Sequence, residues 1–341
     1  MSDTILLETA ERLFGDIITP QVLAAAERGD YPAAAWDALA EAGLHLGLLP
    51  EEAGGFGVAP EDALALLRVA GRHALPLPLA ETMLAGWLLS GAGIGVPDGA
   101  LTVASGLSLR RDGGKWHIAG TLRGVAWGRD AAAVAVLSEV DGVAHVALLS
   151  GGYGIVERGN IAREPRDTLE VDAVPDAVAV SAVSRLELRA AGAATRALMI
   201  AGALERMTEM TTQYALDRSQ FGRPIGRFQA IQHSLATLAA QTAAALAAGG
   251  MAAESVVGGV KLPAIAAAKA RASEAAGIGA GLAHQIHGAI GFTYEHSLHF
   301  FTKRLHAWRD EYGGEAEWNE LLGRHLAAAG ADALWPTLTA I

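Results

Sequence analysis

Apolar residues recur at helical spacing over the first part of the chain. Trp36, Leu39 and Ala40, for example, fall on one face of a helix, and this period predicts a run of helices. The expected helices cover residues 6–13, 22–26, 33–42, 61–73 and 81–90. A loop rich in proline and glycine, residues 50–57, interrupts them.

Beyond residue 99 the pattern changes to short runs that favour β-strands. These runs cover residues 101–105, 116–120, 132–137, 144–149, 169–171 and 177–180. Turn-like clusters separate several of them, and Asp141-Gly142 between two apolar runs is a strong hairpin signal. Closely spaced short strands of this kind predict an antiparallel β-barrel or sandwich.

From residue 183 onward the pattern is that of long, alanine-rich helices. They are expected over residues 186–216, 228–248, 263–288, 298–308 and 317–329, which predicts an antiparallel bundle. Residues 246–260 contain paired glycines, so we expect a loop or a loose helix end there. The predicted fold is α+β, with an N-terminal all-α domain (1–98), a middle β domain (99–182) and a C-terminal helical bundle (183–341).

Composition narrows the possible classes of protein. The chain has 341 residues, of which 51% are hydrophobic and 18% charged, so a well-buried core is expected rather than disorder. The net charge of −11 argues against a broad nucleic-acid-binding face. The absence of cysteine excludes disulfides, thiolate catalysis and cysteine-ligated metals. We expect no membrane span and, because the start lacks the regions of a signal peptide, a cytoplasmic location.

The most informative stretch runs from Tyr214 to His233, between two of the long helices. Gly222 and Pro224 should end one helix, and the next should begin near Ile225. A turn that presents arginine, glutamine and phenylalanine together can bind an anionic ligand that contains a ring. The alternative is an ordinary helical hairpin with a charged turn.

The same stretch resembles a known signature. Its spacing, Arg-x-Gln-Phe-Gly-x-Pro-Ile-x-x-Phe-Gln-x-x-Gln-His, is similar to the C-terminal-domain signature of the acyl-CoA dehydrogenase family. Two further segments resemble that family: Leu-Pro-Glu-Glu-x-Gly-Gly-x-Gly over residues 49–57, and Gly-Gly-Lys-Trp-His-Ile-Ala-Gly-Thr over residues 113–121. The resemblance covers nearly the whole chain and implies that it is a short, divergent member.

A fourth resemblance, over residues 285–296, completes the cofactor contacts that the family implies. One glycine of the family pattern is Ala289 here. The implied FAD contacts, made across a subunit interface, are Arg218, Gln220, Phe221, Phe228, Gln229, Gln285, Gly288 and Gly291. A guanidinium suits a pyrophosphate because it can donate to two oxygens at once. For Phe228 a place in the helix interface is the alternative, and the glycine loop could be a simple helix cap.

The middle domain departs from the family pattern. The tryptophan and threonine that contact the flavin ring in the family correspond to Gly124 and Ala126, and Trp127 is out of step with them. The domain is also short. Weaker contacts with the flavin ring are therefore expected.

The resemblance implies a reaction in which a base removes the α-proton of an acyl thioester and the β-hydrogen passes to the flavin as hydride. The base must be a carboxylate near the ring. Counting without gaps from Gly288 places one family position of this base on Tyr312, and a shift of one residue places it on Glu311. The other position falls on Gly192. Glu311 is therefore the candidate catalytic base, with a solvent-exposed loop acid as the alternative.

Five histidines also lie close together in this part of the sequence: His284, His287, His296, His299 and His306. No spacing among them reproduces a His-Glu-x-x-His helix. We expect surface or interface histidines and no metal site.

Three hypotheses for the function follow. The first is an FAD-dependent acyl-CoA dehydrogenase that gives a trans-2-enoyl-CoA and passes electrons to an electron-transfer flavoprotein. The second is a non-catalytic or half-site subunit of a heteromeric dehydrogenase, which contributes FAD contacts across the interface. The third is a flavin-free ligand-binding bundle. The first two imply a homo- or hetero-oligomer, and none involves a nucleic acid.

Overall fold

The structure is a computed structural model that describes residues 2–256 and 259–339. Its contacts group the chain into two compact units, one made of residues 1–63 and 76–189 and the other of residues 64–75 and 190–341. The division into three domains remains a prediction.

Short helices form the first part of the first unit. They are α1 (Ser2–Ile17), α2 (Pro20–Glu27), α3 (Ala33–Glu41), the 3-10 turns η1 (Leu44–Leu46) and η2 (Glu51–Ala53), and α5 (Leu79–Gly91). Helix α2 begins where the Thr19 hydroxyl accepts a hydrogen bond from the Val22 amide at 3.3 Å, with Pro20 in the first turn. Trp36 and Leu39 are buried, as their spacing predicts, and in α2 the buried residue is Leu23.

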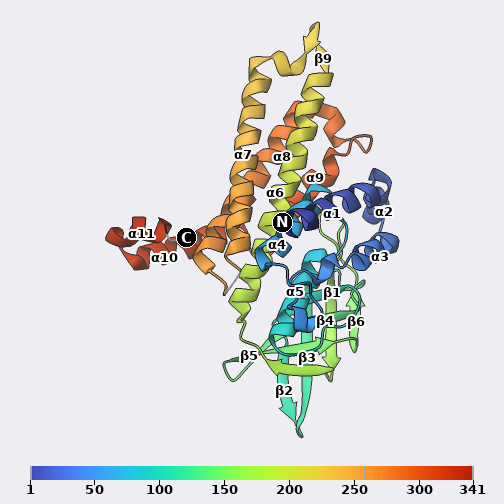
Figure 1. The fold of residues 1–341 in the computed structure, drawn as a ribbon, viewed down its shortest axis with the longest axis vertical. Coiled ribbons are helices and arrows are strands. Elements are labelled where there is room, and N and C mark those ends of the chain that lie inside the picture. The colour runs from blue at the N-terminus through green and yellow to red at the C-terminus, as the bar shows by residue number, and fades with distance from the viewer. Residues whose placement is uncertain (1, 257–258, 340–341) are drawn as a thin grey trace. The chain divides into compact units, whose positions relative to one another are not determined.

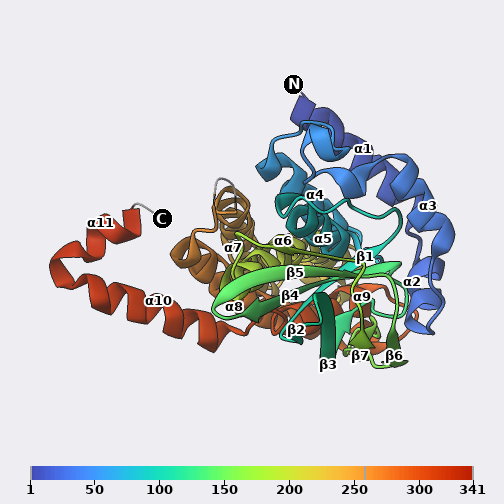
Figure 2. The same ribbon diagram turned by 90° about the horizontal axis from the view of Figure 1, so that it is seen from below.

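Two four-stranded sheets follow in the same unit (Figure 2). The first has the order β1-β4-β5-β8 and the second β2-β3-β7-β6. The strands are β1 (Leu101–Ser105), β2 (Ser108–Asp112), β3 (Lys115–Ala126), β4 (Ala133–Val140), β5 (Val143–Leu149), β6 (Tyr153–Val156), β7 (Arg166–Ala173) and β8 (Ala177–Val180). One hydrophobic cluster includes Ile118 and Leu169 from one sheet and Val136 and Leu149 from the other. The domain is thus a sandwich, and no closed barrel forms among the described residues.

The predicted hairpin at Asp141-Gly142 is confirmed. Val140 pairs with Val143, and the two residues between them have φ angles of 51° and 79°. Positive φ at both central positions is the geometry of a two-residue type I′ turn.

Two strands of these two sheets, β2 and β6, were not predicted from the sequence. In β2 a single residue, Leu109, is buried between exposed polar neighbours, and in β6 no residue is buried. Both strands lie at the edges of their sheet. An edge strand with few buried side chains does not produce a clear alternation of apolar and polar residues.

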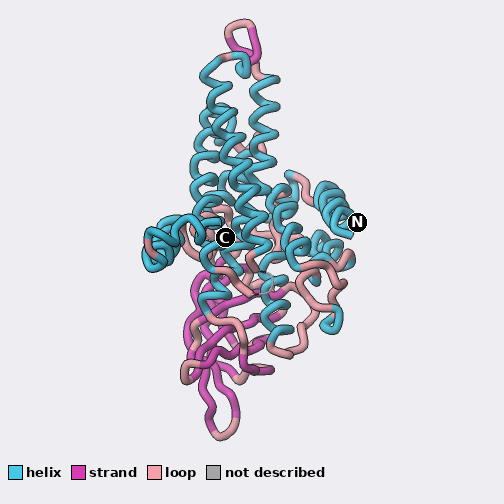
Figure 3. The backbone as a smooth tube through the Cα atoms, turned by 60° about the vertical axis from the view of Figure 1, so that its left-hand side comes forward, coloured by secondary structure: helices cyan, strands magenta, loops and turns pink. Residues whose placement is uncertain are grey.

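The second unit is a bundle of long helices (Figures 1 and 3). It contains most of α4 (Pro60–Arg72) and α6 (Arg185–Asp217), followed by α7 (Gln229–Glu254), α8 (Leu262–His287), α9 (Leu298–Trp308), α10 (Glu315–Ala329) and α11 (Leu334–Thr339). Helix α8 packs against α7, α9 and α10. The strands β9 (Ser219–Gln220) and β10 (Arg223–Pro224) lie between α6 and α7, and the 3-10 turns are η3 (Ile225–Arg227), η4 (Gly288–Phe292) and η5 (Ala331–Ala333).

Of the two interpretations of residues 246–260, a helix end fits the first part and a loop does not, because α7 continues to Glu254. A side chain at Gly249 would come within 3.4 Å of Leu198 and 3.5 Å of Ala201. This glycine therefore allows two helices to approach closely and does not break one. Residues 257 and 258 of the predicted loop lie outside the described residues.

Among the described residues, one helix, α7, is long and apolar enough to cross a bilayer by length and composition. A third of its most apolar window, 33%, is buried in the fold. A single helix of this kind is weak evidence for a membrane span.

Candidate functional site

The hairpin between α6 and α7 presents an exposed aromatic ring at its tip. Gln220 pairs with Arg223, and the two residues between them, Phe221 and Gly222, have φ angles of 52° and 78°. The turn is again of type I′. A bulky residue in this left-handed region costs roughly 1–2 kcal/mol, and the Phe221 ring is 92% exposed. A strained residue whose side chain packs so little is typical of a binding site.

Short-range contacts hold this hairpin on the start of α7. The Arg223 guanidinium lies 4.3 Å from the centre of the Phe228 ring, and the Phe221 and Phe228 rings meet edge to face at 6.1 Å. The Ile225 amide donates to the Arg218 carbonyl at 2.8 Å. Phe228 therefore supports the turn and packs against the cluster of Ala215, Ile225 and Ile286, which is the helix-interface alternative; its contact with a cofactor stays a prediction.

A cavity of about 640 Å³ lies beneath the hairpin, within the size range of small-molecule sites. Six of the residues predicted to contact a cofactor line it: Arg218, Gln220, Phe221, Phe228, Gln285 and Gly288. In the sequence, α7 and most of α8 lie between the first four residues and the last two. The fold brings the two groups together. Their contact with a cofactor stays a prediction.

The other two predicted contacts do not line the cavity. Gln229 is exposed at the start of α7. Gly291 is buried, and a side chain there would come within 3.0 Å of His287 Cβ and 3.2 Å of His284 Nδ1. Packing against these histidines is thus sufficient to explain a glycine at position 291.

The chemistry of the cavity fits a dinucleotide such as FAD. Arg218 is exposed, and no carboxylate of residues 2–256 and 259–339 forms an ion pair with its guanidinium. The amides of Gln220 and Gln285 can donate to and accept from a ligand, and Ile225 and Ile231 supply an apolar wall. One cation, two amides and an apolar wall together suit a pyrophosphate that is joined to a ring.

Sequence reasoning missed the inner wall of the cavity. Tyr214 stacks on His287 at 4.4 Å between ring centres, and the Tyr214 hydroxyl donates to the His287 carbonyl at 3.2 Å. His296 meets the His287 ring at 4.6 Å. Tyr214 lies in the last turn of α6, four residues before Arg218, and this spacing could have identified it. No group of three or more His, Asp or Glu side chains with metal-binding geometry occurs among the described residues.

This wall predicts a dependence of stability on pH. Burial lowers the pKa values of His284 and His287 from their ordinary value near 6.5, and neighbouring histidines lower them further. Between the folded and unfolded pKa values the unfolded chain binds more protons. The unfolding free energy should therefore fall as the pH drops through the window that begins near 6.5, as thermal melting from pH 7.5 to pH 5.5 would show.

A matched pair of variants isolates the contribution of His287. His287→Phe keeps a ring against Tyr214 but cannot take up a proton, so its melting temperature should fall less steeply with pH. His325→Gln, on the exposed face of α10, should leave the slope unchanged. An identical slope in His287→Phe and in the unaltered chain would contradict this account.

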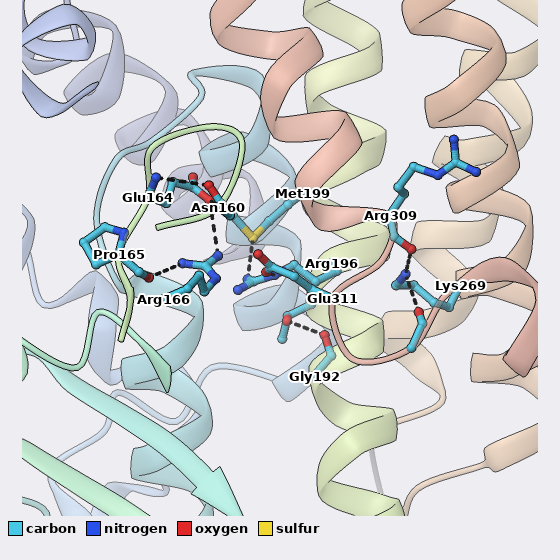
Figure 4. Close-up of polar contacts among 12 residues, drawn as sticks. Asn160, Glu164, Pro165, Arg166, Gly192, Arg196, Met199, Lys269, Arg309 and Glu311 are labelled. Atoms are coloured by element: carbon cyan, nitrogen blue, oxygen red, sulfur yellow. Dashed lines mark hydrogen bonds and ion pairs between the residues drawn. The ribbon is translucent and has the colours of Figure 1, made fainter. Parts of the chain in front are cut away.

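The candidate base lies in an ion pair. Glu311 Oε2 is 2.7 Å from Arg196 Nε, and the arginine side chain is only 2% exposed (Figure 4). The two other positions at which the family resemblance places a base, Tyr312 and Gly192, are in direct contact: a Cβ atom on Gly192 would lie 2.3 Å from the Tyr312 ring. Neither of them carries a carboxylate.

In the first unit, the positions expected to contact a flavin ring lie along β3. Gly124 has a φ of 68° where the pairing of β3 with β7 shifts register, and no atom lies within 4 Å of the place a side chain would take. Ala126 and Trp127 are buried. The Trp127 ring meets the Tyr31 ring edge to face at 6.3 Å, so it packs within this unit.

A second cavity, of about 300 Å³, lies beside Trp127 and also escaped sequence reasoning. Tyr31 and Asp130 line it together with charged residues of both signs. Burial raises the pKa of Asp130 to about 6, against the opposing effect of Arg129. Its residues come from three distant segments of the chain, and no local motif marks them.

Comparisons with known proteins match both the N-terminal helices and the C-terminal bundle. Family models described as the acyl-CoA dehydrogenase N-terminal and C-terminal domains match residues 2–93 and 187–319. The chain is 30% identical over 315 residues to acyl-CoA dehydrogenase IpdE2 of Mycolicibacterium smegmatis, which covers 89% of this chain and 91% of the relative.

Solved structures share the fold over nearly the whole length. A variant of the Tcur3481-Tcur3483 steroid ACAD superposes with a TM-score of 0.87 at 27% identity, over 96% of this chain and 98% of that chain. The ChsE4-ChsE5 complex from Mycobacterium tuberculosis superposes with a TM-score of 0.88 at 24% identity and the same coverage. At this identity the second match shows the fold alone.

Proposed function

The chain belongs to the acyl-CoA dehydrogenase family, and from this premise we propose that it is the half-site subunit of a heteromeric, FAD-dependent acyl-CoA dehydrogenase. One observation carries the proposal: both positions for the base lack a carboxylate and are in contact with each other, because the Tyr312 ring covers Gly192. The cavity under the Arg218 hairpin, in contrast, keeps groups that suit a dinucleotide.

In this proposal the chain binds FAD without removing a proton from the substrate. Arg218, Gln220 and Gln285 would hold the pyrophosphate and its neighbouring groups, and a related partner subunit would supply the base and most contacts with the flavin ring. FAD, when bound, accepts a hydride from the acyl-CoA and passes electrons to an electron-transfer flavoprotein. One similar solved structure is a variant of the Tcur3481-Tcur3483 steroid ACAD, so a bulky ring system joined to the thioester is the first substrate to test. A cytoplasmic location is part of the same proposal.

Co-purification tests the proposal. The chain expressed alone should be colourless or hold much less than one FAD per subunit, and expressed with a related dehydrogenase chain it should give a yellow complex that acyl-CoA bleaches. In that complex Glu311→Gln should leave the rate of dye reduction within about twofold. A stable yellow homo-oligomer that reduces a dye with acyl-CoA would rule the half-site role out.

The second candidate is a dehydrogenase active by itself, with Glu311 as base. It is favoured by the place of Glu311, beside Tyr312 and close to one of the two family positions. To act, Glu311 would have to leave a guanidinium 2.7 Å away. In this case Glu311→Gln should abolish bleaching of the flavin by acyl-CoA while flavin binding survives.

A further inference from the structure

A buried lysine joins α8 to the loop between α9 and α10. Lys269 is 0% exposed, and its Nζ donates to the Arg309 carbonyl at 2.6 Å (Figure 4). It also donates to the Gly313 carbonyl at 3.0 Å and to Ser273 Oγ at 2.9 Å. The Ser273 hydroxyl also donates to the Arg309 carbonyl, at 3.0 Å. One ammonium thus has three oxygen acceptors, which matches the three hydrogens it can donate.

The Arg309 and Gly313 carbonyls flank the segment whose Tyr312 ring lies on Gly192, where the family resemblance expects the catalytic base. Arg309 and Gly313 flank the short segment that carries Glu311 and Tyr312. Within it Tyr312 has a φ of 56°, in the left-handed region, and the Gly313 amide donates to the Asp310 carbonyl at 3.3 Å. A bulky residue holds such a backbone conformation only where its surroundings fix it. Lys269 fixes the carbonyl on each side of it.

This conformation determines where the Tyr312 ring lies. Three atoms of the ring fall within 2.7 Å of the place a Gly192 side chain would occupy, and the Arg196 guanidinium carbon is 5.5 Å from the ring centre. The same guanidinium pairs with Glu311. The ring and the neighbouring carboxylate are thereby held on one face of α6.

We propose that Lys269 is a positioning residue: through the Arg309 and Gly313 carbonyls it holds the Tyr312 ring on Gly192 and so closes the base position in this chain. The proposal rests on the half-site function. Burial lowers the pKa of Lys269 to about 7; Glu311 and Asp310 raise it, and Arg196 and Arg309 lower it.

The test follows Tyr312 directly. The chain has five tyrosines, so labelling with 3-fluorotyrosine gives five ¹⁹F signals, and Tyr312→Phe assigns the one in question. In Lys269→Met, which keeps the length of the side chain but donates no hydrogen bond, the Tyr312 signal should move toward the position of a solvent-exposed ring. The signals of Tyr31, Tyr153 and Tyr214 should stay in place. If Lys269 only stabilised the fold as a whole, Lys269→Met would shift all five signals or none of them.

A control variant and a second test show whether the Tyr312 signal depends on Lys269. Lys261→Met, at the exposed start of α8, should leave every signal unchanged, and a folded Lys269→Met with an unmoved Tyr312 signal would overturn the proposal. If that variant does not fold, Lys269→Gln decides: its shorter side chain keeps a hydrogen-bond donor but does not reach both carbonyls, so the Tyr312 signal should move in the same direction. A folded Lys269→Gln with an unmoved Tyr312 signal would sink the idea.

These measurements use the chain without flavin or partner, so their outcome is separate from the co-purification test. A chain that proved active by itself would refute the half-site function and leave the contacts of Lys269 to be judged on the Tyr312 signal. An unmoved signal would refute the role of Lys269 and leave the flavin results as they stand.

Discussion

Replacing Arg218 with alanine should weaken FAD binding to the assembled complex by about 10- to 100-fold. Hydrogen bonds to a charged group contribute about 1.5–3 kcal/mol, and each 1.4 kcal/mol changes a binding constant tenfold. Arg218 lines the cavity and pairs with no carboxylate of the described residues. Its guanidinium is therefore available to a phosphate, and the variant loses that contact without breaking an ion pair within the protein.

Titration of the apo complex with FAD, followed by the quenching of flavin fluorescence, measures the loss. Arg218→Lys should give an intermediate affinity, because an ammonium keeps the charge but cannot donate to two oxygens in a fixed fork. Arg227→Ala is the matched control: Arg227 is exposed in the neighbouring turn and does not line the cavity. Equal losses in Arg218→Ala and Arg227→Ala would mean that general attraction, and not the cavity, binds the flavin.

The same cavity shows what the sequence could predict of the site. Arg218, Gln220 and Phe221 lie within four residues, so a local turn was enough to place them together. The Gln285–Gly288 wall was predicted only through the family resemblance. The stack of Tyr214 on His287, at 4.4 Å, joins residues that lie on different helices. The register of α6 against the end of α8 sets this contact, and the spacing of apolar residues along the sequence does not determine that register.

The closed base position was beyond prediction for the same reason. Tyr312 and Gly192 were identified one at a time, as two alternative positions for one carboxylate. Their contact depends on the packing of α6 against the loop after α9, where Arg196 and Glu311 lie 115 residues apart in sequence. The sequence therefore predicts Glu311, the carboxylate next to the expected position, as the candidate base. Its ion pair with Arg196 does not follow from the sequence.

The fold was predicted best where burial is strong. The helix expected over residues 298–308 matches α9 (Leu298–Trp308), in which nine of the eleven residues are buried. The apolar strand β4 (Ala133–Val140) was also found. The edge strands β2 and β6 were missed, because they bury too little to leave a pattern. The paired glycines in α7 misled the prediction, because glycine marks close helix packing as well as helix ends.

Close packing of this kind makes Gly202→Ala the substitution with the largest expected effect on stability. A Cβ atom on Gly202 would lie 1.8 Å from the carbonyl oxygen of Arg68, and one on Gly71 would lie 2.0 Å from that of Met199. The two glycines thus let α4 and α6 meet backbone to backbone. Both obstructing atoms belong to the backbone of a helix, so the helices must separate to admit a methyl group.

The expected cost of Gly202→Ala is about 3 kcal/mol of unfolding free energy, or a melting temperature lower by about 4 °C in a chain of 341 residues. Ion pairs beside the crossing, Arg68–Glu205 at 2.9 Å and Arg72–Glu209 at 2.7 Å, would be strained by the same separation. Urea unfolding and calorimetry measure both quantities. A loss below about 1 kcal/mol would show that the crossing can open at little cost and that its glycines are not required for packing.

Gly250→Ala, in the same bundle, should raise the free energy of unfolding, whereas Gly202→Ala should lower it. Gly250 lies inside α7, is exposed, and has no atom within 4 Å of the place its side chain would take. Alanine there removes the conformational entropy cost of glycine without a clash, so the chain should gain about 0.5–1 kcal/mol. The two substitutions add the same methyl group to a helical glycine, and only the space around it differs. A loss of stability in both variants would mean that helix propensity and packing are not separable here. A loss in Gly202→Ala with a gain in Gly250→Ala would show that Gly202 is required for the contact between α4 and α6.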